Sequence, residues 1–336
     1  MTDGFDRRTF LKQVAVGAAA LAATVGPFPA QAKKPSARPG VGRVKVDKGY
    51  FDAFGLDPVV ARRVLTAALS AGGDFADLFA EHSTSRALAL EDGKVNRARV
   101  SVDLGVGVRV VKGDQTGFAY TEDLSPEALV EAAKTAAAIA SGPARDVVLP
   151  VRVAVPGSLY DQRVPWAQVG TDRRKPLLDL ANSLALASSG LVRKVRVSFD
   201  DEVSHVLIVD SDGRWVEDCR PIGSFLVACV AEKDGRREEN WSNRSSRSGF
   251  ETFDEALVRT ITKEAVDRTL LLFDAVRPPP GEMPVVLAAG SSGILLHEAI
   301  GHGMEADFNR KGVSIFADKI GRRIAPDFVT IVDDGT

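Results

Sequence analysis

The sequence is poor in the residues that most often bind metals or form cross-links. It contains only four histidines and two cysteines among 336 residues. It also lacks an excess of either charge, because 43 lysines and arginines face 45 aspartates and glutamates. A nucleic-acid-binding protein usually needs a basic excess to neutralise phosphates, so this balance argues against a nucleic-acid partner. Nowhere does an apolar run reach the roughly 20 residues that span a bilayer, which argues against stable membrane insertion.

The two cysteines, Cys219 and Cys229, are too few for a disulfide framework. They could form one bridge in an oxidising compartment. Both lie in strand-like patterns, where a free cysteine behaves as a small apolar side chain. We therefore expect them to be small, unpaired, buried residues on strands.

Residues 1–32 resemble an export signal that is removed from the mature protein. An Arg-Arg pair at residues 7–8 is typical of the twin-arginine route, and an apolar run at residues 14–25 follows it. Ala-Gln-Ala at residues 30–32 is a cleavage site of small residues. We expect export to the periplasm; the alternatives are a disordered alanine-rich leader and a cytoplasmic protein.

The rest of the chain predicts an α+β fold, with two helix plus antiparallel-meander modules followed by the start of a mixed α/β domain. Residues 45–150 form the N-terminal module and residues 158–276 the central one. Three consecutive prolines within residues 277–282 can continue neither a helix nor a central strand, so they mark a boundary. Residues 282–336 then begin a third domain. We expect it to be incomplete, because it ends at an Asp-Gly turn signal with no returning strand.

Local patterns place the elements of these domains. Asp57 and Ser125 suit the N-cap position of two helices, and a Thr-x-x-Glu capping box at residues 252–255 predicts another. Tight turns are expected at the Asp-Gly pairs of residues 92–93, 212–213 and 234–235. Strands are expected at residues 75–81, 87–90, 95–104, 106–111, 116–120, 284–288 (buried) and 329–332.

Two of the four histidines, His297 and His302, lie five residues apart, and Glu298 follows the first. Many zinc peptidases carry His-Glu-x-x-His on one helix face, so this spacing is one residue longer. A straight α-helix would turn the two imidazoles about 140° apart. Gly301 precedes the second histidine, and a helix can bulge or end at glycine. We predict that the helix, which starts near Gly293, widens or breaks near Gly301 and brings both imidazoles to one ion.

These residue types suit zinc chemistry. Neutral imidazoles bind Zn²⁺ well, and catalytic zinc sites keep one position open to water. Bound zinc lowers the pKa of its water and polarises a peptide carbonyl. Glu298 is placed to take the proton of that water and pass it to the leaving amine. The alternative is that His297 and His302 form a partly buried helix end and that Glu298 is solvated.

The sequence leaves the third zinc ligand open. Glu305 and Asp307 follow closely and could reach back past a turn. They could equally be surface carboxylates or hydrogen-bond partners of a ligand. His82 and His205 lie in strand patterns and are expected to be structural residues.

The motif belongs to a longer stretch, HEAIGHGMEAD at residues 297–307, which is very similar to the His-Glu-x-x-x-His helix of the TldD/PmbA family. Residues 104–125 resemble the N-terminal domain signature of that family, and residues 329–336 resemble a segment inside its last domain. This family comprises zinc metallopeptidases formerly called modulators of DNA gyrase. The resemblance spans roughly residues 75–336 and identifies residues 282–336 as the start of a metallopeptidase domain.

The resemblance implies that His297 and His302 bind zinc and that Glu298 is the catalytic acid and base. It also implies a homodimer, or a heterodimer with a paralogue lacking the metal motif, that cleaves unfolded or short peptides in an enclosed cavity. In family members a cysteine far downstream completes the zinc site, and this chain stops before that region, so we expect a C-terminally truncated sequence. We therefore predict a zinc metallopeptidase. The rival is a non-catalytic interaction subunit, or a fragment, that pairs with a complete family partner.

Overall fold

The computed structural model describes residues 49–144, 147, 152–154, 160, 162–290 and 293–332. The chain divides into two units, Met1–Asp47 and Lys48–Thr336, and every described residue belongs to the second. The export signal predicted at residues 1–32 lies outside the described residues and stays a prediction. Among the described helices, none is both long and apolar enough to cross a membrane.

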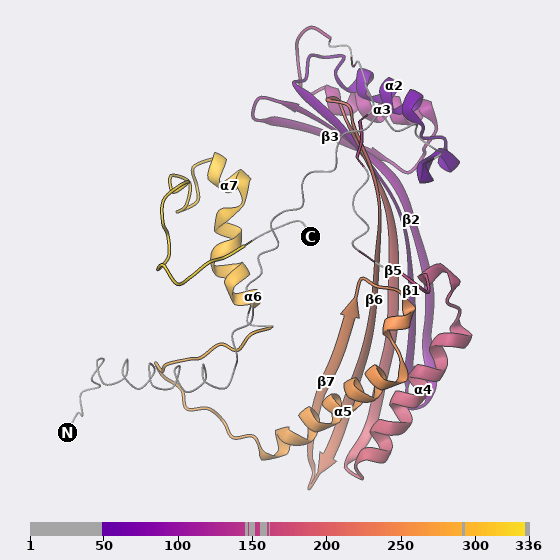
Figure 1. The fold of residues 1–336 in the computed structure, drawn as a ribbon, viewed down its shortest axis with the longest axis vertical. Coiled ribbons are helices and arrows are strands. Elements are labelled where there is room, and N and C mark those ends of the chain that lie inside the picture. Colours follow the sequence, from indigo (N-terminus) through magenta and orange to yellow (C-terminus); the bar gives the residue numbers. More distant parts are fainter. Residues whose placement is uncertain are drawn as a thin grey trace, which may run out of the picture. The chain divides into compact units, whose positions relative to one another are not determined.

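One sheet runs through the described chain (Figure 1). Its strands follow the order β3-β2-β1-β5-β6-β4, and β7 also pairs with β6. Neighbouring strands are antiparallel except β4 with β6. Together with the helices that cover it, the sheet confirms the predicted α+β fold. The strands are β1 (Phe75–Glu91), β2 (Lys94–Lys112), β3 (Gln115–Thr121), β4 (Arg152–Ala154), β5 (Val192–Asp210), β6 (Arg214–Lys233) and β7 (Arg236–Ser246).

Strands β1 and β2 are longer than the sequence pattern predicts. The break expected at residues 82–86 is absent, because this polar stretch pairs with β2 on one side and β5 on the other. The break expected at Gly105 is also absent, because Gly105 stays in register with Glu81. Pairing with a neighbouring strand thus keeps these residues extended although their side chains show no clear apolar alternation.

The predicted tight turns are confirmed. Asp92 and Gly93 join β1 to β2 with φ angles of 49° and 76°, and Asp234 and Gly235 join β6 to β7 with φ angles of 53° and 77°. Gly213, in the turn between β5 and β6, has a φ of 87°. These angles are free of strain at glycine and tolerable at aspartate. The turn residues therefore set where each hairpin reverses.

Pairing between β1 and β5 joins the two predicted modules into one sheet, beginning with Asp77 opposite Asp210. One face of this sheet carries two hydrophobic cores. In β1, Leu78 belongs to one core and Leu88 to the other. Side chains alternate between the two faces of a strand. Leu78 and Leu88 are separated by an even number of residues, so both cores lie on the same face of the sheet.

Four helices cover that face, two at each end of the strands (Figure 1). Helices α2 (Pro58–Ala68) and α3 (Pro126–Ala137) cover the core that contains Trp215. Helices α4 (Thr171–Ser188) and α5 (Glu255–Leu271) cover the core around Trp166. The opposite face of the sheet is left without these helices.

Short polar side chains start these helices. Asp57 and Ser125 cap α2 and α3 as predicted, each accepting a hydrogen bond from a backbone N–H of the first turn. Helix α5 is capped by Asp254, whose carboxylate accepts a hydrogen bond of 2.8 Å from the first turn. The capping box predicted at residues 252–255 was wrong, because Phe250–Thr252 form a separate 3₁₀ turn ahead of the helix.

The strands predicted at residues 284–288 and 329–332 are absent. Both stretches are irregular, and Val286 is 96% exposed where a buried strand was expected. An apolar stretch forms a stable strand only against a partner, and no strand in the described part of the chain pairs with either stretch. Helical turns lie between them, in the order α6 (Gly293–Leu296), the π-helix η5 (His297–Gly301), the 3₁₀ helix η6 (His302–Met304) and α7 (Ala306–Arg310).

Candidate metal centre

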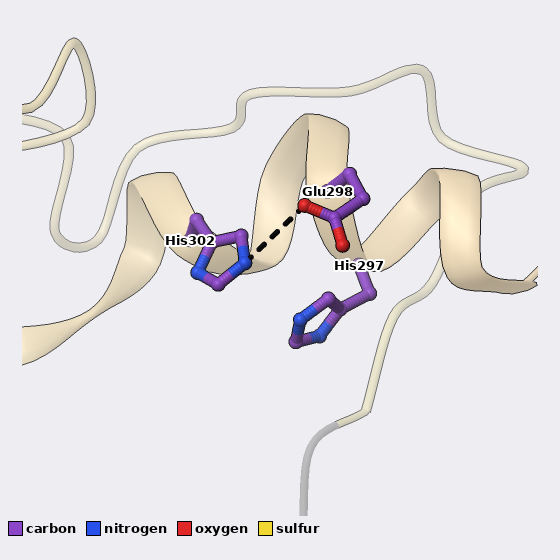
Figure 2. A group of neighbouring side chains, drawn as sticks. All are labelled: His297, Glu298 and His302. Carbon is purple, nitrogen blue, oxygen red and sulfur yellow. Dashed lines mark ion pairs between the residues drawn. The ribbon is translucent and has the colours of Figure 1, made fainter.

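The two histidines of the motif meet across one widened helical turn (Figure 2). The backbone N–H of His302 donates to the carbonyl of His297, five residues back, which is the hydrogen bond of a π-turn. Their ring centroids lie 4.6 Å apart, with the ring planes at 68°. A regular α-helix would point the rings about 140° apart. The predicted widening of the helix is therefore confirmed.

One glycine makes room beside this turn. A β-carbon on Gly301 would be in ordinary van der Waals contact with the His297 ring, 3.4 Å from Nδ1, whereas Gly303 is tightly enclosed. A β-carbon on Gly303 would lie 2.9 Å from the ring of Phe316. The Gly303 carbonyl also accepts a hydrogen bond of 3.1 Å from the Asn309 amide. The chain after the motif thus folds back onto the helix end and supports the turn.

The turn brings three potential metal ligands together. One donor atom from each of His297, Glu298 and His302 lies within 4.8 Å of the other two. Within the described ranges, no other three histidine, cysteine or acidic side chains are arranged in this way. The Glu298 carboxylate lies 3.3 Å from Nε2 of His302 (Figure 2). All three side chains are exposed, so the group is open to solvent.

Glu305 contacts the far side of the second histidine. Its Oε1 lies 2.6 Å from Nδ1 of His302. This hydrogen bond, with a smaller effect of Glu298, raises the pKa of His302 above its ordinary value. If Nδ1 carries the proton in that bond, Nε2 keeps a lone pair for an ion. The structure therefore gives Glu305 the position of an orienting partner, whereas the exposed Asp307 makes no side-chain hydrogen bond or ion pair with a described residue.

The donor set fits zinc. Zinc favours nitrogen and sulfur ligands in about four positions, and the two imidazoles provide two of them. The cysteines lie elsewhere, as free thiols on β6: Cys219 is half-buried and Cys229 is buried. Burial raises the pKa of Cys229 to about 11, so this thiol is a poor source of the thiolate that zinc prefers. The prediction that the cysteines are unpaired residues on strands is confirmed, but the predicted burial is correct only for Cys229 and wrong for half-buried Cys219.

The other two histidines pack against a tyrosine. His82 on β1 lies opposite His205 on β5. The Tyr50 hydroxyl is hydrogen-bonded to Nδ1 of His82 at 2.7 Å, and the Tyr50 ring stacks on His205 with centroids 3.7 Å apart. Burial lowers the pKa of His205, which favours its neutral form. These contacts hold the short helix η1 (Tyr50–Phe54) on the sheet, in agreement with the structural role predicted for both histidines.

Three family models match consecutive parts of the chain. PmbA/TldA metallopeptidase domain 1 matches residues 76–140, the central domain matches residues 165–273, and the C-terminal domain matches residues 280–336. The last of these contains the candidate metal centre.

Individual proteins match over the same region. The chain is 37% identical over 270 residues to the metalloprotease TldD homolog of Haemophilus influenzae, which covers 78% of this chain and 56% of the relative. It is 24% identical over 270 residues to the zinc metalloprotease TldD homolog of Saccharolobus solfataricus, with 78% and 57% covered. The chain thus spans about half the length of the curated relatives it matches.

A solved structure shows the same fold. The crystal structure of a candidate modulator of DNA gyrase from Thermotoga maritima aligns with a TM-score of 0.61 at 19% identity, over 78% of this chain and 58% of that protein. The three family models, supported by the relatives, show that the chain belongs to the TldD/PmbA family.

Proposed function

We propose that this chain carries the active site of a zinc-dependent metallopeptidase that cleaves unfolded or short peptides. Its relatives are named metalloproteases, and one is named a zinc metalloprotease. The observation that carries the proposal is the π-turn, which places the imidazoles of His297 and His302 beside the Glu298 carboxylate. Without this turn the two histidines would point to different sides of the helix and could not share one ion.

Each side chain has one task in this proposal. His297 and His302 hold the ion through their ring nitrogens. When bound, zinc supplies the Lewis acidity that activates a water molecule and polarises the peptide carbonyl. Glu298 accepts the proton of the attacking water at its carboxylate and delivers it to the nitrogen of the leaving amine. Glu305 accepts the Nδ1 hydrogen of His302 and so fixes the tautomer of that ring.

Three variants of the full chain test these roles. Glu298→Gln should keep bound zinc and lower peptide cleavage by at least about a hundredfold, because it removes the general base. His297→Ala should lose both zinc and cleavage, whereas Asp307→Asn, which changes an exposed carboxylate close to the motif, should lose neither. Zinc is measured by elemental analysis after reconstitution, and cleavage with a fluorescence-quenched unstructured peptide.

The assays are run on the chain alone and together with a family paralogue, since a homodimer or a heterodimer is part of the proposal. A well-folded protein that binds no zinc after reconstitution would refute the metal site. If zinc binds but the unchanged protein cleaves no peptide in either assembly, the rival of a non-catalytic interaction subunit is correct. Equal cleavage by Glu298→Gln and the unchanged protein would refute the role of Glu298.

A further inference from the structure

The face of the sheet opposite the helices is hollowed by a groove of about 1000 Å³ over β1, β2, β3 and β5. Leu78 points into a helix-covered core, so Phe79 and Glu81 point to the opposite face and line the groove. The strand register extends this surface sideways, because Phe79 lies opposite Gly107 on β2 and Ile208 on β5. Four strands that are distant in sequence thus build one concavity.

Glycines and exposed aromatic rings shape the groove. Gly105 and Gly107 leave its floor on β2 without side chains. Phe118 and Tyr120 border it on β3 and are 62% and 73% exposed. A β-carbon on Gly107 would lie 2.9 Å from the Phe118 ring, so the glycine lets this ring lean over the floor. Exposed aromatic faces attract ammonium and guanidinium groups.

The groove carries a surplus of negative charge. Six carboxylates and two guanidinium groups line it. Both guanidinium groups are already engaged, Arg109 with Asp77 and Arg214 with Asp210. Four carboxylates are left that form no ion pair with any described residue, namely Glu81, Asp103, Glu122 and Glu202.

Two of these four carboxylates accept hydrogen bonds from neutral groups. Glu81 and Glu202 accept hydrogen bonds from neutral serine hydroxyl groups, at 2.5 and 2.7 Å. The side chains of Asp103 and Glu122 are exposed and make no hydrogen bond with the described part of the chain. Like charges gathered in a concave surface repel one another and raise the local concentration of cations. A cationic ligand would relieve this repulsion.

We propose that this groove binds a basic, extended polypeptide segment. Alternate side chains of an extended chain point the same way, about 7 Å apart. Gly107, Gly105 and Asp103 follow the same alternation along β2, so lysine or arginine at alternate positions would reach the carboxylates while their stems pack on Tyr120. Nucleic acid does not fit, because its phosphates carry the same charge as the groove. The inference goes beyond the proposed function, since this binding requires no metal.

Peptide binding to the full chain tests the inference directly. The probe is a short fluorescein-labelled peptide of alternating lysine and serine, and the reference is the same peptide with glutamate in place of lysine. Fluorescence anisotropy should show the basic peptide binding about tenfold tighter or more, with an affinity that falls as salt is added. The affinity should be the same with a chelator and with added zinc. Equal binding of the two peptides overturns the proposal.

Variants of groove residues test whether the basic peptide binds in the groove. Asp103→Asn combined with Glu202→Gln should weaken binding of the basic peptide about tenfold, because two charge pairs are lost. The matched control, Glu232→Gln combined with Asp234→Asn, removes the same charge from exposed residues outside the groove and should leave binding unchanged. If the first variant does not fold, as judged by circular dichroism, Glu122→Gln is used in its place. This single change should lower the affinity for the basic peptide about threefold.

Two results overturn the proposal without affecting the metal site. One is an equal loss of binding in the groove variant and in its control. The other has two parts: the unchanged protein does not bind the basic peptide, and sedimentation shows that the groove variant has lost a dimer that the unchanged protein forms. The groove is then occupied by a second copy of this chain. If zinc-dependent cleavage persists in either case, the proposed metallopeptidase function is not contradicted.

Discussion

Replacing Glu305 with alanine is expected to weaken zinc binding about tenfold. The Glu305 carboxylate lies 2.6 Å from Nδ1 of His302 and is the main cause of the raised pKa of that histidine. The contact favours the tautomer that carries its proton on Nδ1 and leaves Nε2 free as a ligand. Without the carboxylate the ring can rotate and change tautomer, so a smaller fraction of the protein is ready to bind the ion.

The structure sets the size of this effect. Hydrogen-bond partners of metal ligands change metal affinity by roughly 10- to 100-fold. The side chains of His302 and Glu305 are 49% and 46% exposed, so water competes for the contact and the lower end of this range applies. If Glu305 were itself a zinc ligand, the loss would exceed about a hundredfold and approach that of His302→Ala.

The assay is a competitive titration with a fluorescent zinc indicator, with every variant measured at the same series of pH values so that proton competition at His302 is compared directly. Asp307→Ala is the matched control, since it removes a carboxylate two residues away that makes no side-chain hydrogen bond or ion pair with the part of the chain that the structure describes. Glu305→Gln keeps an oxygen acceptor and should recover part of the affinity. Equal zinc affinities of Glu305→Ala and Asp307→Ala would show that the Glu305 carboxylate does not orient His302 for metal binding.

Three further predictions concern buried groups of the sheet and its core. Asp201→Asn should lower the free energy of unfolding by about 3–5 kcal/mol, because the buried charge of Arg174 loses its partner. Arg86→Gln, which changes the more exposed partner of Asp201, should lower the free energy of unfolding by only about 1 kcal/mol. Equal midpoints of urea unfolding for the two variants would contradict this difference. Because burial raises the pKa of Cys229 to about 11, a thiol reagent at neutral pH should modify half-buried Cys219 first, as mass spectrometry would show. The stability that the neutral Cys229 thiol contributes is complete below roughly pH 8.5 and is lost as the pH rises towards about 11.

Features that depend on neighbouring residues could be predicted from the sequence. Asp57 and Ser125 cap their helices because a cap needs only a backbone N–H two or three residues ahead. The Asp-Gly turns reverse the hairpins for a similarly local reason. The widened turn at Gly301 was also predictable, because the hydrogen bond that defines it spans only five residues. The contact of Glu305 with His302 was left open, since nearness in sequence does not say which side of a ring a carboxylate reaches.

Local sequence therefore specifies the caps of α2 and α3, the hairpin turns and the helical turn that gathers His297, Glu298 and His302, since each depends on atoms a few residues apart. Three features depend instead on long-range contacts: β1 and β5 join two modules into one sheet, residues 284–288 form no strand, and four strands build an acidic groove. Apart from proline, every residue carries the same backbone N–H and C=O groups, so local pattern does not specify which strands pair or in what register. That choice depends on packing between residues far apart in the chain, and it places the groove on the face that the helices leave open.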